Sequence, residues 1–176
     1  MRKALSMFLG LGLLAGGVMM MQAQRPRVSP HETVSATIGG KKVTVEYGRP
    51  SKKGREIFGK LVPYGQVWRT GADEATTLTT EGDIMLGSLH VPAGTYALFT
   101  IPTENDWTLV VNKTAKQWGA FKYDEKMDLG RVKMKTGKTG SPMETFTITI
   151  AGGNGNTGKL AMAWDTVEAS IPVMMH

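Results

Sequence analysis

The residues between positions 47 and 77 are the best suited to chemistry, because charged side chains are interspersed there with large aromatic ones. The charged members are Arg49, Arg55, Arg69, Asp73 and Glu74, and the aromatic members are Tyr47, Phe58, Tyr64 and Trp68. An unpaired buried charge is costly, so this mixture indicates either a buried polar network or a binding surface.

Asp73 and Glu74 form the best carboxylate pair in the chain. Two acids that flank a sugar bond can hydrolyse it, and Glu74 is the catalytic candidate. Neighbouring residues of a strand point to opposite faces, however, so the two could act together only in a turn. The alternative is that one of them holds Arg69 or Arg49 in a forked ion pair that pins a long loop to the sheet. We favour the ion pair, because structural ion-pair networks also perturb such residues and are common.

A binding site is the other chemistry that this region could support. The arginines would donate forked hydrogen bonds to a carboxylate or phosphate, and Trp68 would offer a stacking face. Trp118, in the segment KQWGAF, is a candidate for an aromatic platform on a loop. The candidate ligand-binding residues are therefore Tyr47, Arg49, Tyr64, Trp68, Arg69, Glu74 and Trp118.

Metal and cofactor chemistry find no support in the sequence. The histidines His31, His90 and His176 show no metal-ligand spacing, and the chain has no cysteine. The glycine-rich stretch 153–159 nearly spells a phosphate-binding loop, but Leu160 stands where a magnesium-binding Ser or Thr is required. We therefore expect neither a metal nor a cofactor.

The elements that position these side chains are predicted to be strands. The sequence contains short runs in which apolar and polar residues alternate, and turn signals separate these runs. Gly39 and Gly40 predict a tight hairpin between strands at 33–38 and 41–47. Further strands are expected at 75–80, 83–86, 88–91, 95–101, 107–112, 129–135, 144–150, 159–164 and 166–173. Because no long amphipathic helix interrupts them, the sequence predicts an all-β fold, an antiparallel β-sandwich or open barrel.

Residues 48–74 break this pattern and are expected to form one long ordered loop with a short helix. Ile57, Phe58 and Leu61 have helical spacing, and Ser51 could cap the helix. The loop would close one end of the β domain.

The first residues are expected to direct the protein to its compartment. Arg2 and Lys3 precede an apolar run that reaches about Met21, and Ala23 offers a small residue for cleavage, which is typical of a secretory signal peptide. The alternative is an uncleaved membrane anchor, because the run approaches spanning length. We expect a signal peptide over 1–23, an extended arm over 24–30 and a single β-rich domain over 31–176.

Export limits the partners that the protein can meet. The chain has 21 basic and 15 acidic residues, a formal net charge of +6. In the periplasm or outside the cell, a basic surface could meet an envelope glycan or an anionic ligand, whereas nucleic acid is not expected there. No stable membrane span is expected after the signal is cleaved.

The residues named above belong to longer motifs. These are Tyr47-Gly48-Arg49-Pro50, then KGREIFG at 53–59, LVPYG at 61–65, VWRTGADEAT at 67–76 and AGTY at 93–96, followed by Trp118-Gly119 and Trp164. With these motifs the chain resembles a family of uncharacterised exported bacterial proteins that is defined only as a domain of unknown function. The resemblance implies a signal peptide, one β-rich domain and bacterial export, and it implies no known activity. It also implies that an Asn more often stands at position 73, so that Asp73 is no required acid.

Three functional hypotheses follow. We favour an exported non-catalytic β-sandwich protein that binds a ligand or partner in the bacterial cell envelope. The alternatives are an envelope glycan hydrolase that uses Glu74 as acid or base, and a structural envelope protein with no small-molecule site. A solvent-open pocket that contains Glu74 and Arg69 would favour binding or catalysis, whereas burial of both in pairs would favour the structural role.

Overall fold

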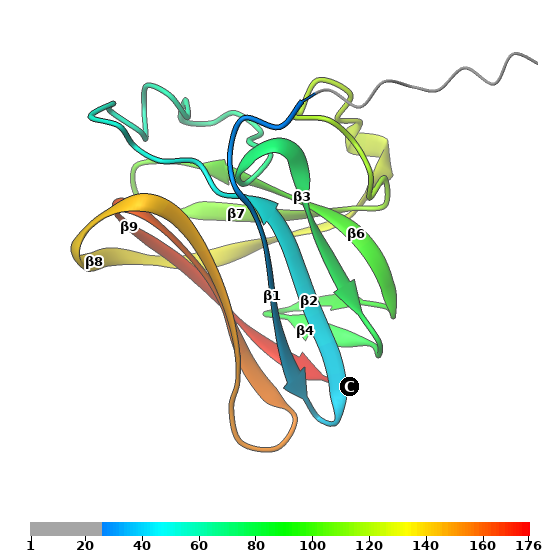
Figure 1. Cartoon of the computed structure of the whole chain (residues 1–176). Coiled ribbons are helices and arrows are strands. Elements are labelled where there is room, and N and C mark those ends of the chain that lie inside the picture. Colours follow the sequence, from blue (N-terminus) through cyan, green and yellow to red (C-terminus); the bar gives the residue numbers. More distant parts are fainter. Residues whose placement is uncertain (1–25) are drawn as a thin grey trace, which may run out of the picture.

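The strands of this protein form one antiparallel sheet in the computed structural model, which describes residues 26–176 (Figure 1). The sheet order is β1-β2-β3-β6-β7-β8-β9-β4-β5. The elements are β1 (His31–Ile38), β2 (Lys41–Gly48), β3 (Ala72–Thr80), β4 (Ile84–Leu86), β5 (Leu89–Val91), β6 (Gly94–Pro102), β7 (Trp107–Asn112), the 3-10 helix η1 (Glu125–Met127), β8 (Asp128–Gly152) and β9 (Thr157–Met175). The sheet curls without closing, which confirms the predicted all-β antiparallel fold.

The signal peptide expected over 1–23 lies outside the described residues. Within residues 26–176, no helix is long and apolar enough to cross a membrane. The arm is described from Pro26 to Pro30, and it leads directly into β1.

The long strands β8 and β9 make the second layer of the fold. The start of β8 pairs with β7, whereas its end pairs with the start of β9 and lies beside β1 (Figure 1). The four strands expected between 129 and 173 are therefore joined into two. The chain bends where the β8–β9 register shifts between Lys138 and Thr147, and where Asp165 adopts a φ of 53°. Such bends interrupt the alternating pattern in the sequence without reversing the chain.

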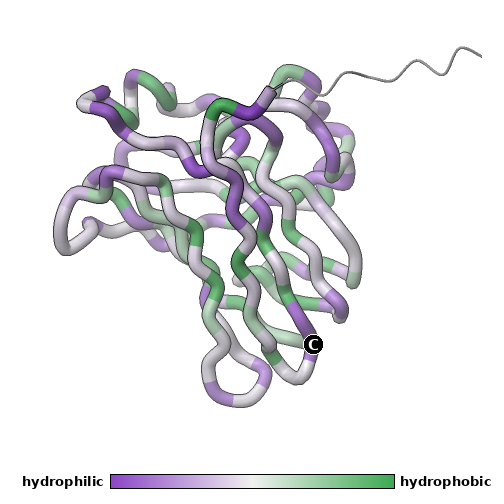
Figure 2. The backbone as a smooth tube through the Cα atoms, viewed as in Figure 1, coloured by the Kyte–Doolittle hydropathy of each residue, from purple (hydrophilic) through white to green (hydrophobic). Residues whose placement is uncertain are grey.

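The core lies between these two layers and follows the alternation of the strands. Val43, Val45 and Tyr47 of β2 are fully buried, while the residues between them face outward. Figure 2 shows the same alternation as green and paler or purple positions along β1 and β2. Strand periodicity thus places one face of β2 in the core and leaves the other face for a surface site.

The loop formed by residues 49–71 is fixed to the core by aromatic side chains. Trp68 stacks on Trp164 with a centroid distance of 6.0 Å and an interplanar angle of 17°. It also makes edge contacts with Phe58, Trp107 and Phe146. Paired rings add stabilisation beyond their buried area, so this cluster explains why so long a loop is ordered.

The prediction of a short helix within this loop is wrong. Lys53, Gly54 and Gly59 adopt φ values of 48°, 71° and 89°. These left-handed conformations cannot continue a right-handed helix, and two glycines make them accessible to the chain. Phe58 instead forms a bridge with Val62, and Ile57, Phe58 and Val62 face the core from a series of turns, whereas Leu61 is exposed.

Arg49 ties the first two strands to β8. Its Nη1 forms an ion pair with Glu32 Oε1 at 2.6 Å, and its Nε donates to the Phe146 carbonyl oxygen at 3.2 Å. Its Nη2 donates to Thr147 Oγ1 at 3.0 Å. All three donor nitrogens of the guanidinium are occupied, so Arg49 is a structural residue of the layer contact.

Tyr47 supports the same contact from inside the core, and it provides the first test. Its hydroxyl accepts the Ile148 N–H at 3.0 Å and donates to Glu32 Oε2 at 3.0 Å. In Tyr47→Phe the buried Ile148 N–H would lose its partner, so we expect the free energy of unfolding to fall by about 1–3 kcal/mol. Denaturant unfolding measures this loss.

The matched control is Tyr64→Phe, because the Tyr64 side chain is exposed. This variant should keep the wild-type free energy of unfolding. Equal stability of the two variants would contradict the role given to the Tyr47 hydroxyl.

Candidate functional site

A bulge at the start of β3 shapes the candidate site. Glu46 pairs with Thr77 and Gly48 with Ala72, so residues 73–76 of β3 oppose Tyr47 alone. Asp73 adopts a φ of 61°, a left-handed conformation that Asp and Asn tolerate better than most residues. Bulges often lie next to functional sites, where they change the direction of a side chain.

The backbone of the bulge holds a second segment, residues 113–124, which we call the crossing loop. The Gly119 N–H donates to the Asp73 carbonyl and the Ala75 N–H donates to the Gln117 carbonyl, both at 2.9 Å. The crossing loop therefore lies over the outward face of β3 and β6. A small apolar cluster fills the space beneath it and consists of Ala75, Ala97, Phe99 and Val110, with Ala120 and Tyr123 packed against them.

The side chain of Asp73 holds the arm. Its Oδ2 accepts the Val28 N–H at 3.2 Å and the Ser29 N–H at 3.0 Å. The residue is only 8% exposed, so this carboxylate acts as a backbone anchor. An amide oxygen can accept the same two hydrogen bonds, which gives a physical reason why Asn would also serve at position 73.

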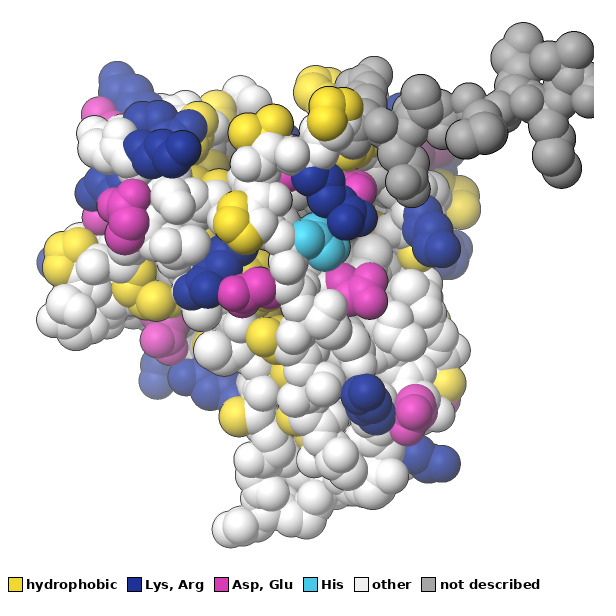
Figure 3. Space-filling view, in the orientation of Figure 1, with side chains coloured by type: hydrophobic (Ala, Val, Ile, Leu, Met, Phe, Trp, Pro, Cys, Tyr) yellow, Lys and Arg dark blue, Asp and Glu magenta, His cyan; other side chains and the backbone are white. Residues whose placement is uncertain are grey.

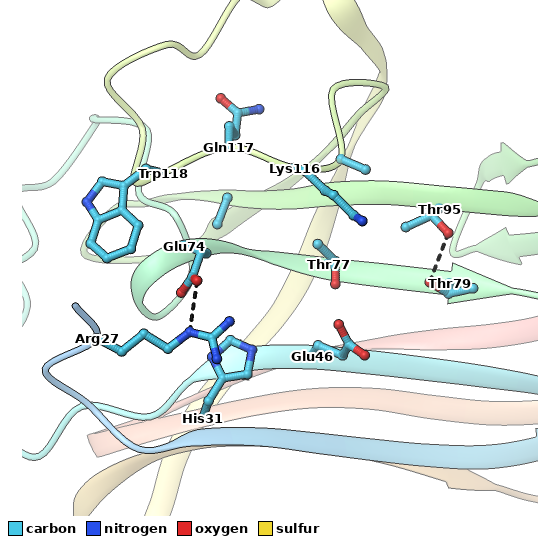
Figure 4. Close-up of a pocket in the computed structure, with 12 residues that line it drawn as sticks. Arg27, His31, Glu46, Glu74, Thr77, Thr79, Thr95, Lys116, Gln117 and Trp118 are labelled. Carbon is cyan, nitrogen blue, oxygen red and sulfur yellow. Dashed lines mark hydrogen bonds and ion pairs between the residues drawn. The ribbon is translucent and has the colours of Figure 1, made fainter. Parts of the chain in front are cut away.

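Between the arm, the bulge and the crossing loop lies a groove of about 670 Å³ (Figure 4). Glu74 projects from the bulge into this groove, and its Oε1 pairs with Arg27 Nε from the arm at 2.8 Å. The groove is lined by Arg27, His31, Glu46, Glu74, Lys116, Gln117 and Trp118, with Thr77, Thr79 and Thr95 on its floor. Within residues 26–176, no three histidine or carboxylate side chains converge as metal ligands would.

Two buried acceptor atoms in residues beside the groove lack hydrogen bonds. Glu74 Oε2 and Gln117 Oε1 are both buried, and neither has a partner within the described part of the chain. Buried acceptors are nearly always satisfied in folded proteins, because an unmet one loses its hydration without compensation. Local exceptions to such rules occur mostly at functional sites.

The structure brings only some of the predicted site residues together. Glu74 and Trp118 line the groove. Tyr47 is fully buried, and Trp68 belongs to the aromatic cluster of the core. Arg49 lies outside the groove, and each nitrogen of its guanidinium already bonds to Glu32 or to β8.

Tyr64 and Arg69 also lie outside the groove. Tyr64 borders a smaller hollow with Phe58 and Trp107, on the side of the β8–β9 layer. Arg69 Nε is buried without a hydrogen-bond partner among the described residues. Burial lowers the pKa of the Arg69 guanidinium from its usual value, and the nearby Asp73 carboxylate partly offsets this effect.

The ion pair expected between the Asp73-Glu74 carboxylates and Arg69 or Arg49 is wrong. Glu74 pairs with Arg27, whereas Arg49 pairs with Glu32. The expected partners were all residues of one stretch of sequence, 49–74. The actual partners come from the arm and from β1, which only the fold brings close.

The sequence did not single out most of the residues that line the groove. Glu46 alternates with the buried Val45 and Tyr47, so its outward direction could be inferred from the pattern of β2. Thr77 and Thr79 flank the buried Leu78 in the same way. What the sequence lacks is the pairing order, which places β2, β3 and β6 side by side.

A polar network fixes the far end of the crossing loop. The Tyr123 hydroxyl donates to Asp128 Oδ2 at 2.6 Å and accepts from Arg131 Nη2 at 2.9 Å. Asn112 Nδ2 donates to Asp128 Oδ1 at 2.8 Å and to the Asp124 carbonyl at 3.0 Å. These bonds attach the loop that carries Gln117 and Trp118 to the ends of β7 and β8.

The family described as "Protein of unknown function (DUF2911)" matches residues 29–173. Among curated proteins and among solved structures, none matches this chain. The matched range includes the bulge, the crossing loop and the strands of the sheet apart from the last two residues of β9.

The anchoring role of Asp73 predicts different effects for two substitutions. Asp73→Asn keeps an acceptor and a tolerated left-handed φ, so its free energy of unfolding should stay close to wild type. Asp73→Ala loses the acceptor and places an unfavourable residue at a φ of 61°, so a loss of about 2 kcal/mol is expected. Denaturant unfolding and hydrogen exchange at Val28 and Ser29 measure both effects. If Asn proves as damaging as Ala, the negative charge matters and not the acceptor.

The network around Tyr123 predicts a change of stability in alkaline solution. Burial, together with the hydrogen bond to Asp128, raises the pKa of Tyr123 from 10.0 to about 12. Between these values the unfolded chain releases the proton and the folded chain retains it, so the stabilising contribution is complete below pH 10 and is lost as the pH rises to about 12. Tyr123→Phe should therefore show a shallower decline of stability across this range.

Denaturant unfolding at a series of pH values tests this difference. At pH 7 the same variant should be less stable by about 1 kcal/mol, because it loses the hydroxyl's hydrogen bonds. If the free energies of unfolding of the wild type and of Tyr123→Phe declined in parallel with pH, the raised pKa assigned to Tyr123 would be contradicted.

Proposed function

We propose that this chain, which belongs to the DUF2911 family of proteins of unknown function, is a non-catalytic binding protein whose groove holds a neutral, polyhydroxylated ligand of the glycan class. The observation that carries the proposal is the lining of the groove, where carboxylate, ammonium and hydroxyl groups converge on one cavity beside an indole. Its volume of about 670 Å³ lies within the usual range of small-molecule sites.

The mixture of donors and acceptors suits sugar hydroxyls. Each hydroxyl both donates and accepts, so it can pair with Glu46 or Lys116. Figure 4 shows Lys116 and Glu46 pointing into the groove from different elements, with Thr77 between them, whereas the Gln117 side chain points away from the groove. Trp118 adds an aromatic wall, and aromatic side chains pack well against the apolar faces of sugar rings.

The charges within the groove favour a neutral ligand over an anionic one. Arg27 and Glu74 neutralise each other at 2.8 Å. Lys116 and Glu46 contribute one charge of each sign. The arginine expected to grip an anion, Arg49, is used by Glu32 instead. A carboxylate or phosphate would therefore meet little net positive charge.

The proposal includes the compartment in which the protein would meet its ligand. The apolar start of the chain over 1–23 supports export, so the ligand would be an envelope or extracellular glycan. Arg27 belongs to the arm that follows this start, and it supplies a groove residue only because Asp73 fixes the arm.

A glycan hydrolase remains the second candidate, because two carboxylates, Glu46 and Glu74, share the groove. The paired state of Glu74 favours binding, since one of its oxygens is held by Arg27. Release of reducing ends from an oligosaccharide would establish hydrolysis, and its loss in Glu74→Gln would assign the acid or base.

Calorimetric titration of the purified protein with neutral disaccharides, and with matching uronic acids and sugar phosphates, tests the proposal. Neutral sugars should bind more tightly than the anionic ones. Glu46→Ala should weaken binding about tenfold or more, because a charged acceptor is lost. Its stability should not change, since the Glu46 carboxylate makes no hydrogen bond to the described residues.

Glu168→Ala is the matched control, because it also removes an exposed carboxylate, but one that pairs with Lys159 outside the groove. This variant should bind like the wild type. Failure of every sugar to bind, or full affinity in Glu46→Ala, would refute the proposal.

A further inference from the structure

A row of hydroxyl groups crosses four neighbouring strands beside the groove. Ser35 of β1 pairs with Thr44 of β2, Thr44 pairs with Thr79 of β3, and Thr79 pairs with Thr95 of β6. Directly opposed residues of antiparallel strands point to the same face, so all four side chains share the outward face of the sheet. At the usual strand spacing the row extends over roughly 14 Å.

These side chains are available to a partner. Ser35, Thr79 and Thr95 are exposed, and Thr44 is half-buried. Thr79 Oγ1 and Thr95 Oγ1 lie 3.0 Å apart in a hydrogen bond, which orients both hydroxyls (Figure 4). The row is therefore a regular and partly ordered array of donors and acceptors.

The row is continuous with the groove. Thr79 and Thr95 belong both to the row and to the groove floor, whereas Ser35 and Thr44 lie beyond the groove. The next parallel row contains Thr33, Glu46 and Thr77, of which Glu46 and Thr77 also line the groove. A ligand that leaves the groove across β2 and β1 would meet hydroxyls at each strand.

The chemistry of this face selects the kind of partner. The core of a protein–protein interface is enriched in aromatic residues, Met and Arg and is depleted in Ser. The row contains none of the enriched types. Figure 3 agrees, because the face over β1 and β2 is largely white, that is, neither charged nor hydrophobic, below the cluster of charged side chains. A hydrated polymer with hydroxyl groups along its length fits such a surface.

We propose that the groove binds one part of a linear polysaccharide, and that the chain continues across β3, β2 and β1 along the row Ser35–Thr44–Thr79–Thr95. The inference rests on the proposed function and adds the polymeric nature of the ligand and the direction in which it runs. Affinity should therefore rise with the length of the oligosaccharide, since longer chains reach more of the row.

The test compares binding of linear β-1,4-linked glucose and N-acetylglucosamine oligosaccharides, from disaccharide to hexasaccharide, by calorimetry. In the wild-type protein the hexasaccharide should bind about tenfold more tightly than the disaccharide, as expected for two or three added hydrogen bonds. The double variant Ser35→Ala, Thr44→Val should lose this gain and keep the disaccharide affinity, because both residues lie outside the groove. Val preserves the shape and strand preference of Thr, so the variant should fold normally.

The control is Thr149→Val, which removes an exposed hydroxyl from β8. It should keep the full dependence on length. If short sugars bind and length adds no affinity, the inference is refuted and the proposed function stands. If the double variant still binds the hexasaccharide more tightly than the disaccharide, the polysaccharide does not run along the row and the inference is refuted. If no oligosaccharide binds at all, both proposals fail together.

Discussion

The site depends on one local constraint, the left-handed conformation of Asp73 in the bulge of β3. Without the bulge, the alternation of the strand would decide where each side chain of residues 73–76 points. With it, the Asp73 carboxylate binds the arm, its carbonyl binds the crossing loop, and Glu74 is directed into the groove. Three segments that are distant in sequence thus meet at a single residue.

The bulge is held in place by the loop that precedes it. Thr70, a β-branched residue, adopts a φ of 57°, which is unusual for such a side chain. Its carbonyl accepts the Thr76 hydroxyl at 2.6 Å, and its own hydroxyl bonds to Thr100. Strained residues persist only where the surroundings determine their conformation, and here Trp68 and the aromatic cluster supply that support. Core packing and site geometry are therefore coupled through residues 68–76.

The charged residues of the Tyr47–Thr77 region serve two different purposes. Arg49 contributes to the contact between the sheet layers, where its donors are satisfied by β1 and β8. Glu74 contributes to the groove, where one oxygen is paired and the other lacks a partner within residues 26–176. Charged side chains of one sequence region thus serve either the contact between the layers or the groove, depending on which elements the fold places beside them. The groove is therefore polar yet nearly neutral, because Arg27 pairs with Glu74 and because Lys116 and Glu46 carry opposite charges.

The sequence alone determined the all-β antiparallel class, the hairpin at Gly39-Gly40 and the outward or inward direction of residues such as Val45 and Glu46. These features follow from local turn chemistry and from the two-residue period of a strand, which neighbouring residues encode. The tertiary structure alone decided that Glu74 pairs with Arg27, that Arg49 pairs with Glu32, and that Thr44, Thr79 and Thr95 form a row. Those contacts depend on which strands become neighbours and on a bulge that shifts their register, and a long-range pairing order leaves no local signal in a single sequence.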